Sequence, residues 1–301
     1  MNNDGVIVGY YSETVRPDHG FIRSADGTFT TYDVPNAAIA GTQINAINNL
    51  GDIAGSYADQ SGNSFGFVRT SNNQLTPLTY VMFSKASPFA LIIPTSLNDS
   101  GIVAGYVLDI PSQCGEGFEG AFPTLYSFNM GGALLKDCST QPTQVSADGS
   151  LIGSFVDQNG IAAGFLSPPS PAPTVTLTIS PIVGALPVSI NASGAIVGTA
   201  GTHSFLRTSD GTYITFDPPN AMTSTAVSIN ASGAICGNFN DLRAIPHGYL
   251  RNSDGTFVIL DAPGAVSATT FGTSVVAIND SGTIVGTFVD LNGIRHGFVR
   301  K

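Results

Sequence analysis

Residues 278–300 read INDSGTIVGTFVDLNGIRHGFVR, and the first part of this stretch decides the fold because it recurs along the chain. The recurring motif is Asn, two residues, Gly, one residue, an aliphatic residue, one residue and Gly. Its copies begin near 2, 48, 98, 146, 191, 230 and 279, with Ser replacing Asn at Ser146. The first glycines of successive copies lie 39 to 50 residues apart. Seven copies at that period predict a toroidal or solenoidal repeat protein.

Each copy is expected to contain four short strands. In the second copy these are QINAI, DIAGSYA, SFGFVRT and LTPLTY, separated by turns rich in Asn, Asp and Gly. Apolar and polar residues alternate with period two, whereas no segment keeps a 3.6-residue period over ten residues, which excludes a helical solenoid. The repeats therefore predict an all-β fold, a seven-bladed β-propeller of four-stranded antiparallel blades, with residues 1–301 as a single domain. A six-bladed ring with leftover strands is the alternative.

Loop lengths predict how each blade is arranged. The turns from first to second strand and from third to fourth strand are tight, whereas the connection after the fourth strand is long. We therefore expect the first strand to be innermost and the fourth outermost. The longer loops then share one face, and a ligand site is expected on that face. The first copy lacks an innermost strand and the last copy lacks an outermost one.

The second glycine of the motif lies within a strand, where we expect neighbouring blades to crowd.

The composition excludes several classes of protein. Charged residues make up 11% of the chain, against about 25% in an average soluble protein. The mean hydropathy is +0.20, which argues against disorder. A net charge of −10 with no basic cluster argues against nucleic-acid binding. No apolar stretch reaches the roughly 18 residues of a membrane span. The absence of Trp removes a common sugar-stacking residue.

Three long segments resemble a known family, the bacterial extracellular repeats of HAF type. They are residues 278–300, residues 2–37 (NNDGVIVGYYSETVRPDHGFIRSADGTFTTYDVPNA) and residues 229–265 (INASGAICGNFNDLRAIPHGYLRNSDGTFVILDAPGA). The resemblance covers nearly all of the chain and is weakest between Pro77 and Leu186. It implies a secreted β-propeller and carries no catalytic residues over to this chain. The sequence opens inside a folded unit with no signal peptide, so we expect it to be cut from a longer extracellular or periplasmic precursor.

Carboxylates are the candidate functional groups. One set recurs after the second strand of most copies, and turn chemistry accounts for it better than a Ca²⁺ site does. Its members are Glu13, Asp59, Asp157, Asp241 and Asp290. A second set does not follow the repeat and is the stronger functional candidate. Its members are Glu116, Glu119 and Asp109, with Arg16 and Arg243 as non-periodic cations.

The histidines and cysteines are assigned mainly structural roles. The four histidines, His19, His203, His247 and His296, all begin the third strand of a copy, and we place Phe65, Gly120 and Ala163 at the equivalent positions elsewhere. Equivalent positions are spread over different blades, which argues against one metal site. Cys114 and Cys138 are a candidate disulfide across an irregular region. Cys236 is expected to be a buried, inert side chain.

These features predict a non-enzymatic binding propeller, which takes a glycan, a surface polymer or a partner protein on its long-loop face. The first alternative is a hydrolase or lyase that acts on a polysaccharide or small molecule through carboxylates in an axial pocket. The second is a purely structural repeat module. No cofactor is expected, with Ca²⁺ as the alternative. The sequence leaves the oligomeric state open.

Overall fold

The recurring Asn and Gly form the turn between the first two strands of a blade. Gly51 has a φ of +83°, a left-handed conformation that favours glycine. Asn48 Oδ1 accepts hydrogen bonds from the backbone N–H groups of Leu50 (3.1 Å) and Asp52 (2.8 Å). The side chain therefore holds the turn closed from within, as an Asx turn does.

A computed structural model describes residues 1–12, 18–37, 41–81, 90–109, 114–129, 140–157, 159–169, 184–266 and 272–301. The side chains of residues 79–81, 90, 109, 114 and 115 are also outside the description. The described residues contain 26 strands, in seven sheets that follow one another along the chain. The predicted all-β, seven-bladed β-propeller class is confirmed, with three to five strands in a blade. No helix in the described part of the chain has the length and apolar character that a membrane crossing requires.

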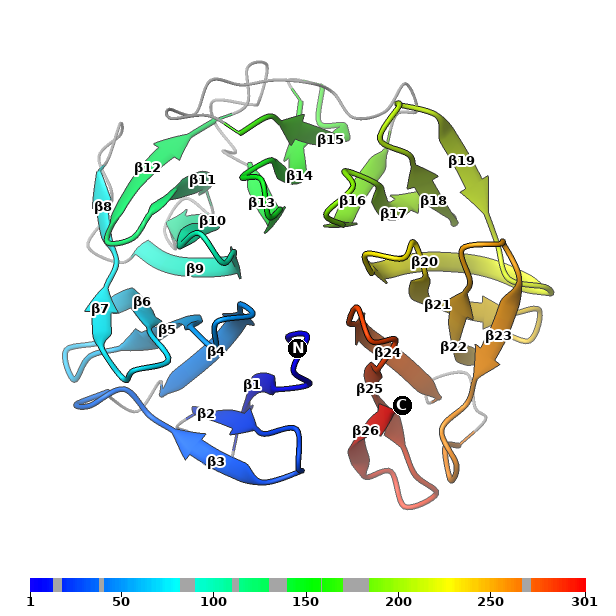
Figure 1. Cartoon of the computed structure of the whole chain (residues 1–301), viewed down its shortest axis with the longest axis horizontal. Helices are drawn as coiled ribbons and strands as arrows, with labels where there is room; N and C mark the ends of the chain where they lie inside the picture. The colour runs from blue at the N-terminus through cyan, green and yellow to red at the C-terminus, as the bar shows by residue number, and fades with distance from the viewer. Residues whose placement is uncertain are drawn as a thin grey trace. The chain divides into compact units, whose positions relative to one another are not determined.

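The chain divides into two compact units, residues 1–179 and 180–301, each built from consecutive blades. Unit 1 has four blades (Figure 1). The first blade is β1 (Ile7–Ser12), β2 (Asp18–Arg23) and β3 (Phe29–Tyr32), and the second is β4 (Thr42–Ile47), β5 (Ile53–Ala58), β6 (Ser64–Arg69) and β7 (Leu75–Pro77). The third is β8 (Thr79–Val81), β9 (Ala90–Leu97), β10 (Ile102–Asp109), β11 (Cys114–Ala121) and β12 (Thr124–Phe128). The fourth is β13 (Gln141–Val145), β14 (Leu151–Val156) and β15 (Ala162–Ser167).

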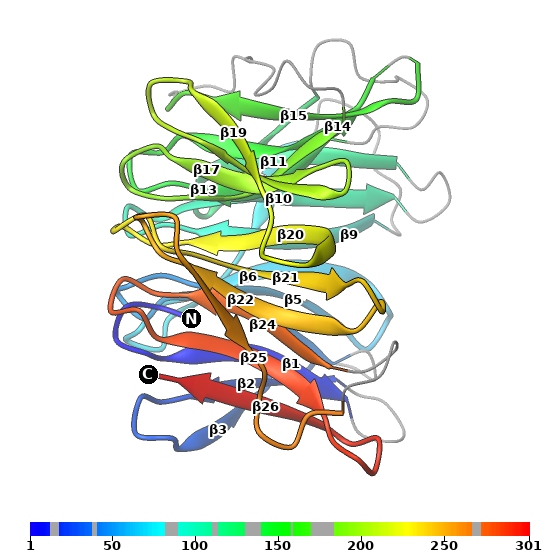
Figure 2. The same cartoon turned by 90° about the vertical axis from the view of Figure 1, so that its right-hand side faces the viewer.

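Unit 2 has three blades. The fifth blade is β16 (Ala185–Ile190), β17 (Ile196–Ala200), β18 (His203–Arg207) and β19 (Tyr213–Phe216). The sixth is β20 (Ala221–Ile229), β21 (Ile235–Asp241), β22 (Pro246–Arg251) and β23 (Phe257–Leu260), and the seventh is β24 (Thr273–Ile278), β25 (Ile284–Val289) and β26 (Arg295–Arg300). Within this unit β24 packs across β20, β21 and β22, so successive sheets stack face to face (Figure 2).

The order of strands within the blades follows the prediction. In the second blade the order is β4-β5-β6-β7, and the first strands β4 and β9 of successive blades pack against each other. Among the described residues, the first blade has no strand before β1 and the seventh has none beyond β26, both as expected. One difference is β8, which adds a fifth strand to the third blade by pairing parallel to β12.

The recurring Asn also joins each blade to the next within a unit. In unit 1 the side-chain amides of Asn2, Asn48 and Asn98 donate to the backbone carbonyls of Asn48 (3.2 Å), Asn98 (3.2 Å) and Ser146 (2.9 Å). In unit 2 Asn191 and Asn230 donate to the carbonyls of Asn230 (3.0 Å) and Asn279 (3.1 Å). One amide thus closes its own turn with its oxygen and binds the next blade with its nitrogen.

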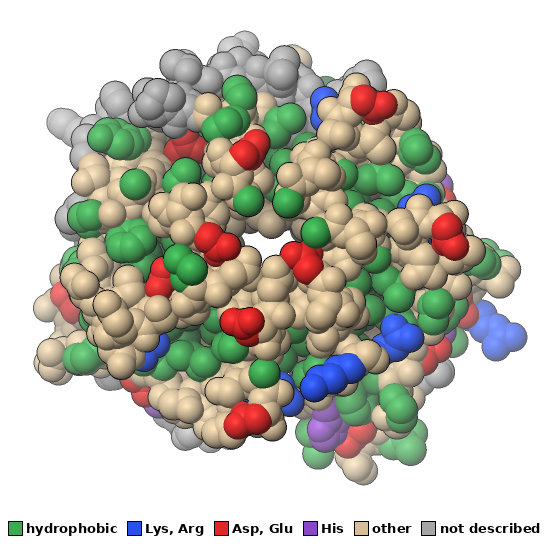
Figure 3. All heavy atoms as spheres, in the orientation of Figure 1, with side chains coloured by type: hydrophobic (Ala, Val, Ile, Leu, Met, Phe, Trp, Pro, Cys, Tyr) green, Lys and Arg blue, Asp and Glu red, His purple; other side chains and the backbone are tan. Residues whose placement is uncertain are grey.

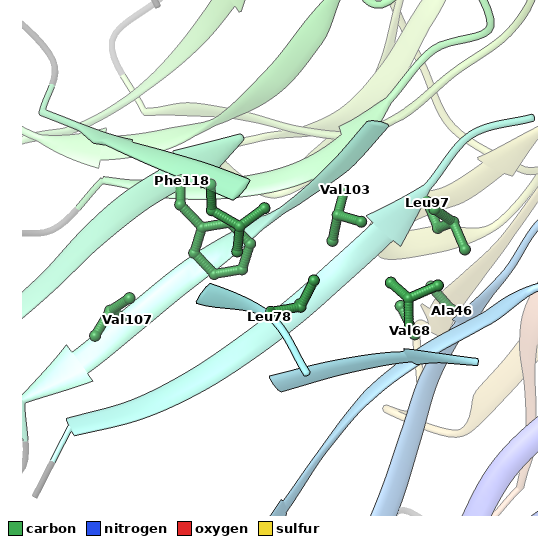
Figure 4. Close-up of a cluster of buried hydrophobic side chains, with 9 residues drawn as sticks. Ala46, Val68, Leu78, Leu97, Val103, Val107 and Phe118 are labelled. Carbon is green, nitrogen blue, oxygen red and sulfur yellow. The ribbon is translucent and has the colours of Figure 1, made fainter. Parts of the chain in front are cut away.

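Apolar side chains fill the space between sheets. Val68 of β6, Leu97 of β9, and Val103 and Phe118 of the third blade form one cluster between the second and third blades (Figure 4). The second glycine of the motif makes room for an aromatic ring within its own blade. A Cβ on Gly105 would lie 2.6 Å from Phe118 and 2.2 Å from the Ile93 carbonyl oxygen. The expected crowding is therefore inside the blade and not between blades.

Candidate functional site

A pocket of about 290 Å³ lies in unit 1, where three blades present the ends of their strands. β2, β4, β6 and β9 begin here and β5 ends here. These are the strand ends to which the second-to-third and fourth-to-first connections attach, the side on which we expected a ligand site. The lining residues are Asp18, Gly41, Gln43, Ser56, Tyr57, Ala58, Gly62, Ser64, Leu91 and Ile93.

A carboxylate and an amide form the polar side of the pocket. Gln43 Nε2 donates to Asp18 Oδ2 at 2.6 Å, and the Ser12 hydroxyl donates to Asp18 Oδ1. Gly41 makes this approach possible, because a Cβ at that position would lie 1.8 Å from the Asp18 carbonyl oxygen. Its φ of +73° also favours glycine. The backbone at Gly41 therefore brings the start of β4 against the start of β2.

An aromatic ring and two aliphatic side chains form the apolar side. Tyr57 stacks on Phe65 with 5.4 Å between ring centroids and 27° between planes. It also meets Phe67 edge-on at 6.2 Å. Burial raises the pKa of the Tyr57 hydroxyl, and the nearby Asp59 carboxylate raises it further. Leu91 and Ile93 of β9 complete this side.

The arrangement suits a small ligand that carries both hydroxyl groups and apolar faces. A carboxylate accepts about four hydrogen bonds and an amide both donates and accepts, so Asp18 and Gln43 supply the group types that bind hydroxyls. Ser56 and Ser64 add hydroxyls at the rim. A pocket with a few convergent polar groups on an apolar wall is the usual form of a small-molecule site.

The two glutamates predicted as site residues do not converge. Glu116 and Glu119 are three residues apart in β11, and side chains alternate between the faces of a strand, so they lie on opposite faces. A pair of carboxylates for acid–base work on one substrate does not form here. Glu116 is partly buried and stands opposite Val107, the register position that histidine holds in β2, β22 and β26. Our assignment of Gly120 to that position was wrong by four residues.

Glu119 is buried between two sheets. Its side chain is on the same face as Ala104, its partner in β10, and Ala104 belongs to the apolar cluster with Val145, Leu151 and Phe165 of the fourth blade. Only 8% of Glu119 is exposed. It occupies the register position of Val68 in β6 and Leu250 in β22. Burial raises the pKa of this carboxyl to about 7.

Of the remaining non-periodic site residues that we predicted, only the Arg243 side chain lies within the described part of the chain. Arg243 is exposed in the β21–β22 turn, where its backbone N–H donates to Asp241 Oδ1 at 2.8 Å. Arg16, Cys138 and the side chains of Asp109 and Cys114 lie outside the described residues, which leaves the predicted disulfide untested. Cys236 is buried, and burial raises the pKa of its thiol to about 12, as expected for an inert side chain.

The recurring acids close their own turns. Asp59 Oδ1 accepts from the N–H groups of Ser61 and Asn63, and Asp157 and Asp290 make the same pairs of bonds in their turns. Hydrogen bonds lower the pKa of each of these carboxyls. The largest cause for Asp59 is its bond to the Asn63 side chain, and for Asp157 it is the bond from the Ile161 N–H. For Asp290 the largest cause is the bond to the His296 side chain. No group of three metal-ligating residues occurs in the described parts of the chain. Acidic side chains on the face in Figure 3 are scattered singly.

The histidines bind acids within their own blades. His19, His203 and His247 each place Nδ1 within 2.6 to 2.9 Å of a carboxylate fourteen residues later, in Asp33, Asp217 and Asp261. Two of the recurring arginines lie over an aromatic ring of the preceding blade. Arg69 lies over the Tyr32 ring at 4.7 Å, and Arg251 over the Phe216 ring at 4.9 Å.

Sequence reasoning missed Asp18, Gln43 and Tyr57. Only Asp18 departs from the repeat. It stands where other third strands begin with Ser64, Pro246 or Arg295. Gln43 stands where β9 has Ile93 and β20 has Thr225, but β13 has Gln141 at the same position. A search for residues that break the repeat near the long loops would therefore have found Asp18 and not the other two.

Comparisons with known proteins bear on the fold. No family model matches the sequence, and no curated protein is significantly similar to it. Among solved structures, an acylaminoacyl peptidase from Pyrococcus horikoshii is similar over 100% of this chain and 50% of its own, with 11% identity and a TM-score of 0.63. A structure from a study of two prolyl endopeptidases is similar over 100% and 47%, with 11% identity and a TM-score of 0.60. The chain thus spans about half the length of these peptidases, and the likeness extends to the fold alone.

A more distant similarity is to the fucose-binding lectin of Aleuria aurantia, a six-bladed β-propeller. It covers 98% of this chain and 86% of the lectin, with 9% identity and a TM-score of 0.40. A likeness of that size carries no weight for function.

Proposed function

We propose that this protein is a secreted, non-enzymatic binding propeller of HAF repeat type and that the pocket in unit 1 takes a glycan. The observation that carries the proposal is a pocket lined by the hydrogen-bonded Asp18–Gln43 pair together with Tyr57, Leu91 and Ile93. Sugars present hydroxyl groups around the ring edge and C–H groups on the ring faces. A carboxylate–amide pair suits the hydroxyls, and an aromatic ring suits the C–H face.

The size and position of the pocket support a small ligand over a protein surface. A volume of about 290 Å³ is close to the lower end of the range for small-molecule sites, about 300 to 1,000 Å³. A stable protein interface would need about 800 Å² on each partner. The pocket also lies at the ends of five strands, on the side of the blades from which the longer loops leave, and binding residues are usually placed at such loop-bearing ends of a rigid scaffold.

A glycan-array screen followed by calorimetry tests the proposal. The strongest array ligand is titrated into the wild-type chain and into Asp18→Asn, Gln43→Ala and Tyr57→Ala variants. Each variant removes one bond or contact, and we expect affinity to fall at least about fivefold, in line with roughly 1 kcal/mol for a lost hydrogen bond.

The repeat provides a matched control. Gln141 holds in β13 the register position that Gln43 holds in β4, and it is exposed outside the pocket. Gln141→Ala should leave affinity unchanged. An array without ligands, or equal losses in Gln43→Ala and Gln141→Ala, contradicts the proposal. A pull-down that retains a protein partner through the same three residues would favour the partner-protein alternative.

A further inference from the structure

We infer that the sugar bound in the pocket of unit 1 carries an N-acetyl group, so that the ligand is an N-acetylhexosamine. The inference rests on the proposed function and deepens it. An acetamido group combines an N–H donor, a carbonyl acceptor and a methyl group in one small planar unit. A site that recognises this group therefore needs an acceptor, a donor and an apolar surface close together. The pocket supplies all three from its lining in the second and third blades.

The acceptor is the side-chain oxygen of Gln43. Its Nε2 donates to Asp18 Oδ2 at 2.6 Å, and because a carboxylate only accepts, this bond turns Oε1 away from Asp18. The Gln43 side chain forms no other hydrogen bond with the part of the chain that the structure describes. A primary amide held by one N–H keeps its oxygen and its second N–H for a ligand, which complements a secondary amide. Asp18 is thus a positioning residue for Gln43.

The donors are two serine hydroxyls on the same face of the second blade as Gln43. In the register of β4 and β5, Gln43 stands opposite Ser56. Ala58, two residues after Ser56, stands opposite Ser64 of β6. Residues related in this way share one face of a sheet. Neither serine hydroxyl forms a hydrogen bond with the described residues, and both serines line the pocket, so each can donate to a ligand carbonyl.

The apolar surface comes from β9 of the third blade. Gly66 stands opposite Ser56, and a Cβ on Gly66 would lie 2.8 Å from Ile92 Cγ2. The face that carries the two serines is therefore the face toward β9. Leu91 and Ile93 of this strand line the pocket. A hydroxyl group set against these side chains would lose its hydrogen bonds to water, whereas the methyl group of an acetamido substituent would gain apolar contact.

Two other classes of sugar match the pocket less well. An unmodified hexose offers no methyl group, so part of its polar edge would lie against Leu91 and Ile93. A 6-deoxyhexose offers a methyl group with no amide beside it, so no single substituent engages both Gln43 and the aliphatic side chains. We therefore expect the pocket to select an N-acetylhexosamine over the same sugar with a hydroxyl group at that carbon.

Two pairs of sugars that differ in this substituent test the inference. Calorimetry compares N-acetylated chitotriose with cellotriose, which has a hydroxyl group in place of each acetamido group. It also compares N-acetylgalactosamine with galactose. We expect the N-acetylated member of at least one pair to bind at least about tenfold more tightly, because a site built to bond a polar group rejects the analogue that lacks it.

Three variants assign the preference to this pocket. Gln43→Leu removes the amide and keeps a side chain of similar size, and it should lower the preference for the N-acetylated sugar at least about fivefold. Ile93→Thr introduces the residue type that β20 has at this register position in Thr225, and it should lower the preference about threefold or more. Gln141→Leu, at the register position of Gln43 but outside the pocket lining, should leave the preference unchanged.

Circular dichroism and thermal melts show that each variant is folded. Equal affinity within both pairs of sugars, or a preference that survives both Gln43→Leu and Ile93→Thr, overturns the inference. A different glycan that binds in the pocket would then leave the proposed function standing. Tighter binding of fucose than of either N-acetylated sugar would also overturn the inference and would assign the aliphatic side chains to a 6-deoxyhexose. Absence of any glycan ligand would remove the proposed function and this inference together.

Discussion

Asn98 shows how one side chain serves both a turn and the contact between blades. Its Oδ1 accepts from the N–H groups of Ser100 (3.0 Å) and Ile102 (2.9 Å), and its Nδ2 donates to the Ser146 carbonyl (2.9 Å). At Ser146 the shorter hydroxyl stays within its own turn, bonding Ser150 O and the Asp148 carboxylate. Asn is therefore the residue that reaches the next blade.

Replacing Asn98 with Ala should lower the free energy of unfolding by about 2 kcal/mol, because the buried Asn98 side chain bonds three backbone groups that would lose this partner. Urea unfolding at neutral pH measures the loss. Asn63→Ala is the control, since Asn63 is exposed and bonds only to Asp59 in its own turn. The Asn63→Ala substitution should lower the free energy of unfolding by less than about 0.5 kcal/mol. Equal losses for the two variants would argue against a role in joining blades.

Glu119 should make stability depend on pH. Its pKa is about 7 in the folded protein and about 4.5 when exposed, so between these pH values the folded state holds a proton that the unfolded state has lost. The free energy of unfolding therefore falls as pH rises from about 4.5 to 7, by on the order of 3 kcal/mol. Glu119→Gln should remove this fall. Glu116→Gln, on the opposite face of β11, should retain it, and a slope that persists in Glu119→Gln would assign the effect to another group.

Sequence reasoning at the residue scale succeeded where the residue repeats. Asn48 and Gly51 were assigned to their turn because seven copies show the same spacing. Asp18 was missed because no other described third strand has Asp at its position, and Gln43 was missed because its contact with Asp18 depends on how Gly41 brings two strands together. Glu116 and Glu119 were grouped because they are close in sequence, although period-two alternation places them on opposite faces.

At the scale of a strand pair, β25 and β26 contain two glycines with opposite requirements. A Cβ on Gly286 would lie 2.3 Å from the Ser274 carbonyl oxygen and 2.6 Å from the Phe298 ring. A Cβ on Gly297 would meet nothing closer than 3.9 Å. Neither has a positive φ, so the difference is one of space.

Gly286→Ala should therefore lower the free energy of unfolding by about 2 kcal/mol or more, as overpacking does. Gly297→Ala should change it by less than about 0.5 kcal/mol, or raise it slightly by restricting the unfolded chain. Chemical denaturation of both variants under one condition gives the comparison. Similar losses at the two positions would mean that the aromatic ring of the third strand does not require the glycine beneath it.

For the whole molecule, the turn carboxylates raise the free energy of unfolding as pH rises, whereas Glu119 lowers it. Hydrogen bonds from Thr208 and Thr212 lower the pKa of Asp210 from 3.8 to about 2, and the pKa values of Asp59, Asp157, Asp254 and Asp290 are lowered too. The contribution of these carboxylates to the stability of the fold is present above pH 3.8 and is lost as pH falls through their lowered pKa values. Combined with Glu119, this predicts maximal stability near about pH 4 to 5. Urea midpoints across roughly pH 2 to 8 check the profile, and a maximum at neutral pH would contradict it.

The fold could be predicted from the sequence because propeller blades repeat the same local chemistry. Turn residues, alternation and loop lengths indicated seven blades, the strand order and the missing strands of the first and seventh blades. The pocket could not be predicted in this way, because it forms where residues of three blades meet and depends on side chains outside the repeat. The sequence indicated the face of the molecule but not the residues on it.

A crystal structure of the chain soaked with its strongest glycan-array ligand tests whether the pocket of unit 1 binds a glycan. We expect a sugar ring in the pocket, with hydroxyl groups within hydrogen-bond distance of the Asp18 carboxylate and the Gln43 amide and one face against Tyr57. A sugar bound at another site, with this pocket holding only water, would contradict it.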